Sequence, residues 1–125
     1  MESPRARKRF LIVEDEAMIA LLLEDYLGDL GYDVAALADN VDDALAQVHS
    51  GGWIDAAILD VNVRGRSIKP VADALKAAGT PFCFMTGYGA GVETGHPDAA
   101  LIGKPFDLEV VRRILADLIG EPGGG

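Results

Sequence analysis

The sequence predicts an α/β domain built on a doubly wound parallel sheet of five strands. Five short apolar stretches lack the alternation of polar and apolar residues found in strands with one solvent-exposed face. Continuous apolar runs of this kind are typical of strands that are buried on both faces. Amphipathic helical patterns separate these stretches, and strands that alternate with helices form parallel sheets. A chain of 125 residues has the length of one domain.

The first two strand–helix units occupy the N-terminal part of the chain. A strand is predicted over Arg9 to Glu14 (RFLIVE), because this run is apolar, rich in β-branched residues and of strand length. A helix follows from Glu16, since leucine and isoleucine recur at the spacing of one helical face, and Gly31 can end it. A second strand is predicted over Tyr32 to Ala38. Asn40 is a good N-cap for the next helix, which the glycines at 51 and 52 stop.

The third unit begins with a buried strand over Ala56 to Asp60 (AAILD), followed by a loop around Arg64-Gly65-Arg66. Pro70 suits the first turn of the helix that comes next, and Gly79 can end this helix. A fourth strand is predicted over Pro81 to Thr86 (PFCFMT).

The pattern changes after the fourth strand. Gly87 to Asp98 contains four glycines and a proline, so we expect a fourth helix that is short or disordered, or a loop in its place. A short fifth strand over Ala100 to Gly103 and an amphipathic helix from Leu108 to Leu118 complete the domain, residues 9–119. Residues 1–8, which are basic, and 120–125 are predicted to be flexible tails.

Composition excludes several classes of function. The 20 acidic and 11 basic residues give a net charge of −9, which makes nucleic acid a poor partner and suggests a bound cation. The longest apolar run, Ala17 to Leu23, has seven residues and is too short for membrane insertion. The single cysteine, Cys83, excludes an internal disulfide and suits a reducing compartment. We therefore expect a cytoplasmic protein.

Polar and charged residues follow the ends of four predicted strands. They are Glu14, Asp15, Asp60, Thr86, Lys104 and Pro105. Ligands of open α/β sheets bind beyond the carboxyl ends of the strands, and three carboxylates gathered there repel one another unless a cation such as Mg²⁺ is present. Lys104 and Thr86 can contact a phosphoryl oxygen, and Asp60 can act as a nucleophile that forms an aspartyl phosphate. Each residue alone has an ordinary explanation, such as a helix cap for Asp15, but the combination predicts phosphoryl chemistry.

These motifs resemble the receiver domains of response regulators in two-component signalling, over nearly the whole chain. The matching segments are Val13-Glu14-Asp15-Glu16, Ile58-Leu59-Asp60-Val61-Asn62, Thr86-Gly87 and Lys104-Pro105-Phe106. The resemblance implies a flavodoxin-like strand order 2-1-3-4-5 and transfer of a phosphoryl group from the phosphohistidine of a sensor histidine kinase to Asp60.

The same resemblance implies roles for the other site residues. Mg²⁺ would be held by Glu14, Asp15, Asp60 and the backbone carbonyl of Asn62. Thr86 and Lys104 would contact the phosphoryl group, and the peptide bond before Pro105 would be cis.

A narrower resemblance concerns Pro81 to Tyr88 (PFCFMTGY), which is similar to the PFxFATGY ("FATGUY") signature of single-domain receivers common in alphaproteobacteria. Met85 replaces the usual alanine. This subgroup implies a kinase of the HWE or a related type, a poorly formed fourth helix and no output domain. The chain would then relay or drain the signal through a phosphotransfer protein or another downstream partner.

Two positions depart from the receiver pattern, Leu101 and Gly103, which directly precedes Lys104. Leu101 stands where receivers usually carry an aromatic residue, so we expect Tyr88 and the glycine-rich loop that begins at Gly87 to supply the mobile element in place of a threonine–aromatic switch. Leu101 and Pro105 are further candidates for switch or loop residues. On the ordinary interpretation Phe82, Phe84 and Leu101 belong to the core.

Three other functions compete with a phosphoreceiver. A receiver-like interaction module that is never phosphorylated would carry the same motifs. A phosphatase of the haloacid dehalogenase type needs a second aspartate two positions after the nucleophile, where this chain has Asn62. An FMN-binding flavodoxin needs a phosphate loop after the first strand, where Glu14, Asp15 and Glu16 would repel the ligand.

Overall fold

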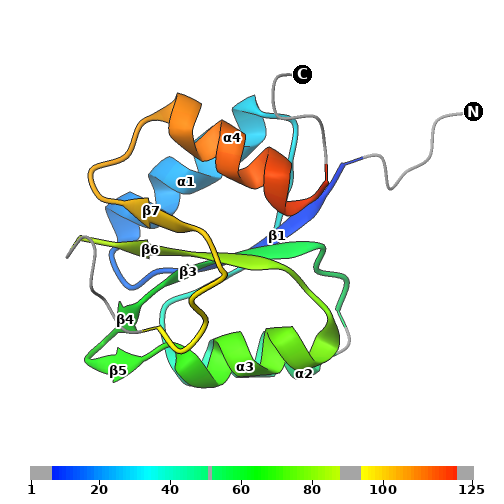
Figure 1. Cartoon of the computed structure of the whole chain (residues 1–125), viewed down its shortest axis with the longest axis vertical. Coiled ribbons are helices and arrows are strands. Elements are labelled where there is room, and N and C mark those ends of the chain that lie inside the picture. The colour runs from blue at the N-terminus through cyan, green and yellow to red at the C-terminus, as the bar shows by residue number, and fades with distance from the viewer. Residues whose placement is uncertain (1–6, 51, 88–93, 121–125) are drawn as a thin grey trace, which may run out of the picture.

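The computed structural model describes residues 7–50, 52–87 and 94–120. Its elements, in chain order, are β1 (Arg9–Val13), α1 (Ala17–Asp29), β2 (Asp33–Ala38), α2 (Val41–His49), β3 (Ala56–Asp60), β4 (Asn62–Val63), β5 (Arg66–Ser67), α3 (Lys69–Ala78), β6 (Phe82–Thr86), β7 (Leu101–Gly103) and α4 (Leu108–Leu118). Five of the strands form one parallel sheet in the order β2-β1-β3-β6-β7 (Figure 1). The predicted α/β class and the strand order 2-1-3-4-5 are confirmed.

Helices cover both faces of this sheet, with α1 and α4 on one side and α2 and α3 on the other (Figure 1). Strand β1 supplies side chains to both layers of the core. Leu11 and Val13 pack with the α2–α3 layer, whereas Phe10 and Ile12 pack with the α1–α4 layer. Burial on both faces explains why the central strands read as unbroken apolar runs.

Local signals place the helix ends close to the predicted positions. The Asn40 side chain accepts a hydrogen bond from the Asp43 N–H and caps α2, as predicted. Pro70 lies in the first turn of α3, and Gly79 ends this helix with a φ of +76°. None of the described helices is long and apolar enough to cross a lipid bilayer.

The structure departs from the predicted loop after β3. Strands β4 and β5 form an antiparallel hairpin of two residues each, in which Asn62 pairs with Ser67 and Val63 with Arg66. Arg64 and Gly65 form the two-residue turn, with φ values of 52° and 79°. Positive φ at both turn residues is the geometry of a type I′ hairpin.

The core prediction for Leu101 was wrong. Leu101 is 37% exposed, because β7 is a short edge strand in which only Ile102 is buried. Phe82 and Phe84 are buried, as predicted.

Several predictions fall partly or wholly outside the described residues. Residues 94–98 contain no helix, which agrees with the glycine-rich interpretation for that part of the segment. Tyr88 and residues 89–93 lie outside the described part, as do residues 1–6 and 121–125 of the predicted tails.

Candidate functional site

Three carboxylates meet at the carboxyl edge of the two central strands. Glu14 and Asp15 directly follow β1, Asp60 ends β3, and these strands are neighbours in the sheet. One oxygen from each of the three side chains lies within 4.8 Å of the others. The structure therefore brings together the three acidic side chains that we predicted to meet because each lies at the end of a strand.

Glu14 is the most buried of the three, and its side chain is wholly inaccessible to solvent. Its Oε2 accepts a hydrogen bond from the Glu16 N–H at 3.1 Å. Its Oε1 accepts no hydrogen bond from the described residues, although Lys104 Nζ lies 3.1 Å away. Burial raises the pKa of Glu14 to about 7, against the opposing effects of the Glu16 N–H and the Lys104 ammonium.

Lys104 places one positive charge among these carboxylates. Its Nζ lies 3.1 Å from Glu14 Oε1, 3.3 Å from Asp60 Oδ2 and 3.7 Å from Glu16 Oε1. The Lys104 N–H donates to the Thr86 carbonyl at 2.8 Å, which fixes this residue beside the end of β6. Burial by itself would lower the pKa of Lys104, but its contacts with Glu14 and Asp60 outweigh burial and raise the pKa.

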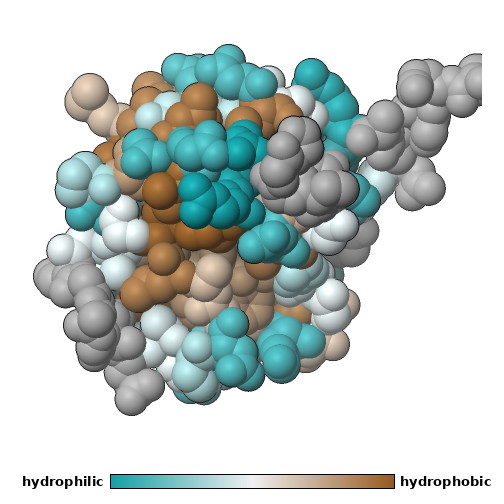
Figure 2. All heavy atoms as spheres, turned by 45° about the horizontal axis from the view of Figure 1, so that its top comes forward, coloured by the Kyte–Doolittle hydropathy of each residue, from teal (hydrophilic) through white to brown (hydrophobic). Residues whose placement is uncertain are grey.

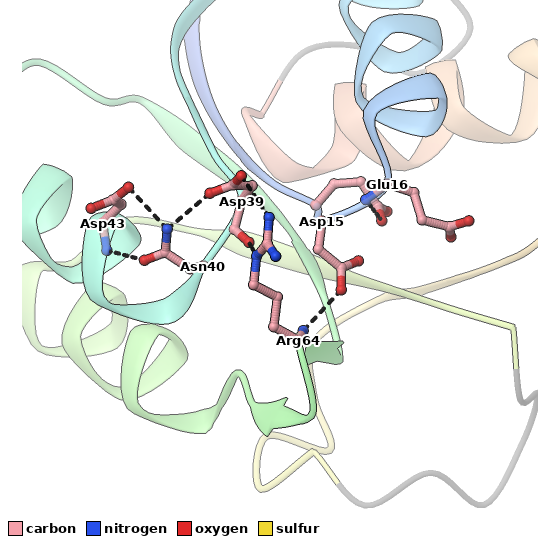
Figure 3. Close-up of polar contacts among 7 residues, drawn as sticks. Asp15, Glu16, Asp39, Asn40, Asp43 and Arg64 are labelled. Carbon is pink, nitrogen blue, oxygen red and sulfur yellow. Dashed lines mark hydrogen bonds and ion pairs between the residues drawn. The ribbon is translucent and has the colours of Figure 1, made fainter.

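Asp15 is oriented from the hairpin that follows β3. Its Oδ2 accepts a hydrogen bond from the Arg64 N–H at 2.8 Å (Figure 3). Sequence reasoning missed this contact and also missed the approach of Glu16 to Lys104. The one available signal was the Arg64-Gly65 pair, because a glycine in the second turn position favours a two-residue hairpin.

A cleft of about 430 Å³ opens onto these groups. Its lining consists of Asp15, Glu16, Asp60, Asn62, Gly87 and Lys104. Thr86 ends β6 and is buried, and it does not belong to this lining. The peptide bond between Lys104 and Pro105 is cis, as the resemblance implied.

A larger groove, of about 730 Å³, lies at the opposite edge of the sheet, before the first residues of β6 and β7. It includes His96 and Asp117 and contains none of the predicted site residues. The chemistry predicted from the strand ends therefore belongs to the smaller cleft.

The smaller cleft fits a divalent cation that prefers oxygen ligands. The three clustered carboxylates, the Glu16 carboxylate that also lines the cleft and the Lys104 ammonium sum to a formal charge of −3 when all the carboxylates are ionised. The buried Glu14 Oε1, which accepts no hydrogen bond from the described residues, gains a favourable partner from a cation. Mg²⁺ takes hard oxygen ligands and keeps coordination positions for water or a phosphoryl oxygen, so these donors suit it.

No protein-family model matches the chain. Among solved structures, SdrG from Sphingomonas melonis Fr1 is 46% identical, with a TM-score of 0.80 and coverage of 91% of this chain and 98% of SdrG. The BeF3-activated conformation of SdrG is similar at 45% identity and a TM-score of 0.78. The REC domain of the PhyR response regulator from Erythrobacter litoralis is 27% identical, with a TM-score of 0.81 and coverage of 94% of both chains.

The curated relatives are longer proteins. The transcriptional regulatory protein DltR of Streptococcus agalactiae is 36% identical over 115 residues, which cover 85% of this chain and 50% of DltR. The chain thus spans about half the length of this relative.

Proposed function

This chain belongs to the receiver domains of response regulators, and from that premise we propose that Asp60 accepts a phosphoryl group from a histidine kinase in a Mg²⁺-dependent reaction. The observation that carries the proposal is the position of Asp60. Its carboxylate belongs to the acidic cluster with Glu14 and Asp15, lies 3.3 Å from the Lys104 ammonium and lines the cleft. The SdrG structure in its BeF3-activated conformation supports the proposal, because BeF3 mimics a phosphoryl group.

In the proposed reaction an Asp60 oxygen attacks the phosphorus of the kinase phosphohistidine. The new P–O bond forms as the P–N bond breaks, and the leaving imidazole takes the electron pair. Lys104 and Thr86 are the proposed contacts of the phosphoryl oxygens, and Lys104 already lies 3.3 Å from Asp60 Oδ2. In this proposal Glu14, Asp15, Asp60 and the Asn62 carbonyl would hold Mg²⁺, which when bound would supply positive charge to the phosphoryl oxygens.

An apolar surface beside the site supports docking of a protein partner. Figure 2 shows the face that carries α1 and α4, on which brown apolar side chains are exposed among teal ones. On α1, which begins two residues after Asp15, Met18 is 82% exposed, and Leu21 and Leu22 are exposed next to it. We assign this surface to the kinase, because a phosphohistidine must come within bonding distance of Asp60 in the neighbouring cleft.

The finer assignments are also proposals. The PFxFATGY subgroup and a kinase of the HWE or a related type are supported by the Pro81 to Tyr88 motif. We also propose that the phosphoryl group is relayed or drained through a phosphotransfer protein or another partner. The likeness to SdrG supports this proposal, because the match covers 98% of the SdrG chain and so includes nearly all of it. Gly87, Tyr88, Leu101 and Pro105 are the proposed switch or loop residues. The cytoplasmic location predicted from the lone cysteine remains a prediction.

The test is phosphorylation of the chain by acetyl phosphate and Mg²⁺, followed by intact mass spectrometry. We expect an acid-labile phosphoryl adduct on the wild type and on Asp29→Asn, which removes an exposed carboxylate from the end of α1. Asp60→Asn should carry none. A wild type without an adduct would favour the interaction module that is never phosphorylated. An Asp60→Asn variant with an adduct would contradict the proposal in another way, because the phosphoryl group would then lie on a residue other than Asp60.

A further inference from the structure

Arg64 occupies a backbone conformation that arginine rarely adopts. It is the first residue of the two-residue turn between β4 and β5, and its φ of 52° lies in the left-handed region. It is the only non-glycine residue with positive φ among the described residues. This conformation costs about 1 kcal/mol for a residue with a Cβ, so other contacts must hold Arg64 in place.

The guanidinium of Arg64 makes those contacts with Asp39, the residue between β2 and the N-cap of α2. Its Nε donates to the Asp39 carbonyl at 2.9 Å, and its Nη2 donates to Asp39 Oδ2 at 2.9 Å. Two hydrogen bonds from one planar group to one residue define the position of the guanidinium in a way that a single charge contact would not.

Asp39 is itself fixed from the opposite side. Its Oδ1 accepts a hydrogen bond from Asn40 Nδ2 at 2.8 Å, and Asn40 caps α2 through the Asp43 N–H. The hydrogen bonds from Asn40 and Arg64 lower the pKa of Asp39, so the carboxylate stays ionised. A continuous chain of contacts therefore runs from the start of α2 through Asp39 and Arg64 to Asp15 (Figure 3).

We propose that Arg64 is a positioning residue for the cation site: anchored on Asp39, it holds the turn amide that orients the Asp15 carboxylate. This inference rests on the proposed function, since it concerns the affinity of the same site for its cation. A ligand whose orientation is fixed in advance loses less conformational freedom when the metal binds, and removal of such supporting contacts typically weakens metal affinity by about 10- to 100-fold.

The hairpin offers a matched control. Arg66 forms an ion pair with Asp42, in the first turn of α2, at 3.2 Å. The Arg66–Asp42 pair therefore joins the same hairpin to the helix whose N-cap directly follows Asp39, the partner of Arg64. Within the described part of the chain, the Arg66 side chain donates a hydrogen bond to Asp42 and to no carboxylate of the cation site. Arg66→Ala and Arg64→Ala remove the same charge, but only the second removes the anchor of the Asp15 contact.

The sign of the effect separates positioning from simple electrostatics. Loss of a positive charge near an acidic site makes the site more attractive to a cation, so charge alone predicts tighter binding for both arginine variants. The positioning role predicts weaker binding for Arg64→Ala only.

The experiment measures the dissociation constant of Mn²⁺, as a paramagnetic substitute for Mg²⁺, from the signal of free Mn²⁺ in electron paramagnetic resonance. We expect about tenfold weaker binding for Arg64→Ala and for Asp39→Ala, and no further weakening in the double variant, because both act through one turn. Arg66→Ala and Asp42→Ala should remain within about twofold of the wild type. Arg64→Lys keeps the charge without the planar fork and should recover only part of the affinity.

Thermal unfolding in a chelator shows which variants are folded, and Arg64→Lys and Asp39→Ala decide the question if Arg64→Ala does not fold. The inference is overturned if Arg64→Ala binds Mn²⁺ as tightly as the wild type, or if Arg66→Ala weakens binding equally. If either of these results is found and the wild type is still phosphorylated in the presence of Mg²⁺, the proposed function stands and only the positioning role of Arg64 is rejected. A wild type that binds no Mn²⁺ rejects the metal site and the positioning role together.

Discussion

At the scale of single residues, Glu14 shows how the fold prepares a cation site. Its side chain is fully buried, one oxygen accepts the Glu16 N–H, and the other accepts no hydrogen bond from the described residues. Lys104 lies close to that oxygen but is shared with Asp60. The ionised form of Glu14 is therefore only partly compensated without a metal.

This environment predicts how stability depends on pH in the absence of metal. The pKa of Glu14 is about 7 in the folded protein against 4.5 for an ordinary glutamate, so the folded state binds the extra proton between these values. The free energy of unfolding should therefore fall as pH rises from about 4.5 to about 7, by roughly 3 kcal/mol at most. Glu14→Gln should lack this component. Urea denaturation at a series of pH values, with a chelator present, measures the difference.

Glu24→Gln is the control, because Glu24 is an exposed glutamate on α1 and its substitution should leave the wild-type slope unchanged. Equal slopes for Glu14→Gln and the wild type would show that burial of Glu14 does not govern the pH dependence.

At the scale of elements, the sequence predicted every strand of the main sheet and every described helix, because each has a clear pattern or cap. The strand over Ala56–Asp60 is apolar throughout and is buried at every position. Asn40 and Gly79 mark helix ends through contacts within a few residues, which a local pattern can reveal. The convergence of Glu14, Asp15 and Asp60 was predictable for the same reason, since the ends of parallel strands share one edge.

What the sequence did not predict depends on non-local packing. Strands β4 and β5 have two residues each, which is too short for a periodic pattern. The contact of Arg64 with Asp39 joins residues 25 positions apart and follows from the placement of the hairpin beside α2. Leu101 is exposed because no described strand pairs with the outer edge of β7, and a three-residue apolar run does not reveal an edge strand.

The segment before β7 provides a prediction at this scale. Gly95 has a φ of +79°, and a Cβ added there would lie 2.8 Å from Lys69 Cε. Asp73 of α3 joins the segment to this helix, because it pairs with His96 at 2.7 Å. Asp73 also accepts a hydrogen bond from Lys69 Nζ within the helix. Gly95→Ala should lower the free energy of unfolding by about 1 to 2 kcal/mol through backbone strain, and it should also displace Lys69.

Gly79→Ala is the matched variant, since Gly79 has a φ of +76° and no atom within 4 Å of an added Cβ. Both variants should lose stability in urea denaturation. Gly95→Ala should in addition shift the His96 ring resonances more than Gly79→Ala, because Gly95 precedes His96 and its added Cβ would meet Lys69, the partner of Asp73. A Gly95→Ala protein as stable as the wild type would contradict the positive φ.

At the scale of the whole molecule, the fold places charged carboxylates directly beside an apolar core. The sheet is held by two apolar layers that exclude water, and their strands end in carboxylates that need water or a cation. The net charge of −9 also causes electrostatic repulsion between acidic side chains over the whole molecule, a background that is not confined to the cleft. A divalent cation in the cleft relieves the local repulsion, whereas dissolved salt only screens the background.

Metal binding should therefore stabilise the entire fold by mass action. A ligand that binds only the folded state at 100 times its dissociation constant raises the free energy of unfolding by about 2.7 kcal/mol. We expect Mg²⁺ to raise the thermal midpoint of the wild type beyond the effect of NaCl at equal ionic strength, which accounts for screening. Asp15→Asn and Asp60→Asn should keep the NaCl effect and lose the additional one, because each removes a ligand charge from the cluster. An equal rise with Mg²⁺ and NaCl in the wild type would mean that the cation acts on the general charge of the molecule and not on the cleft.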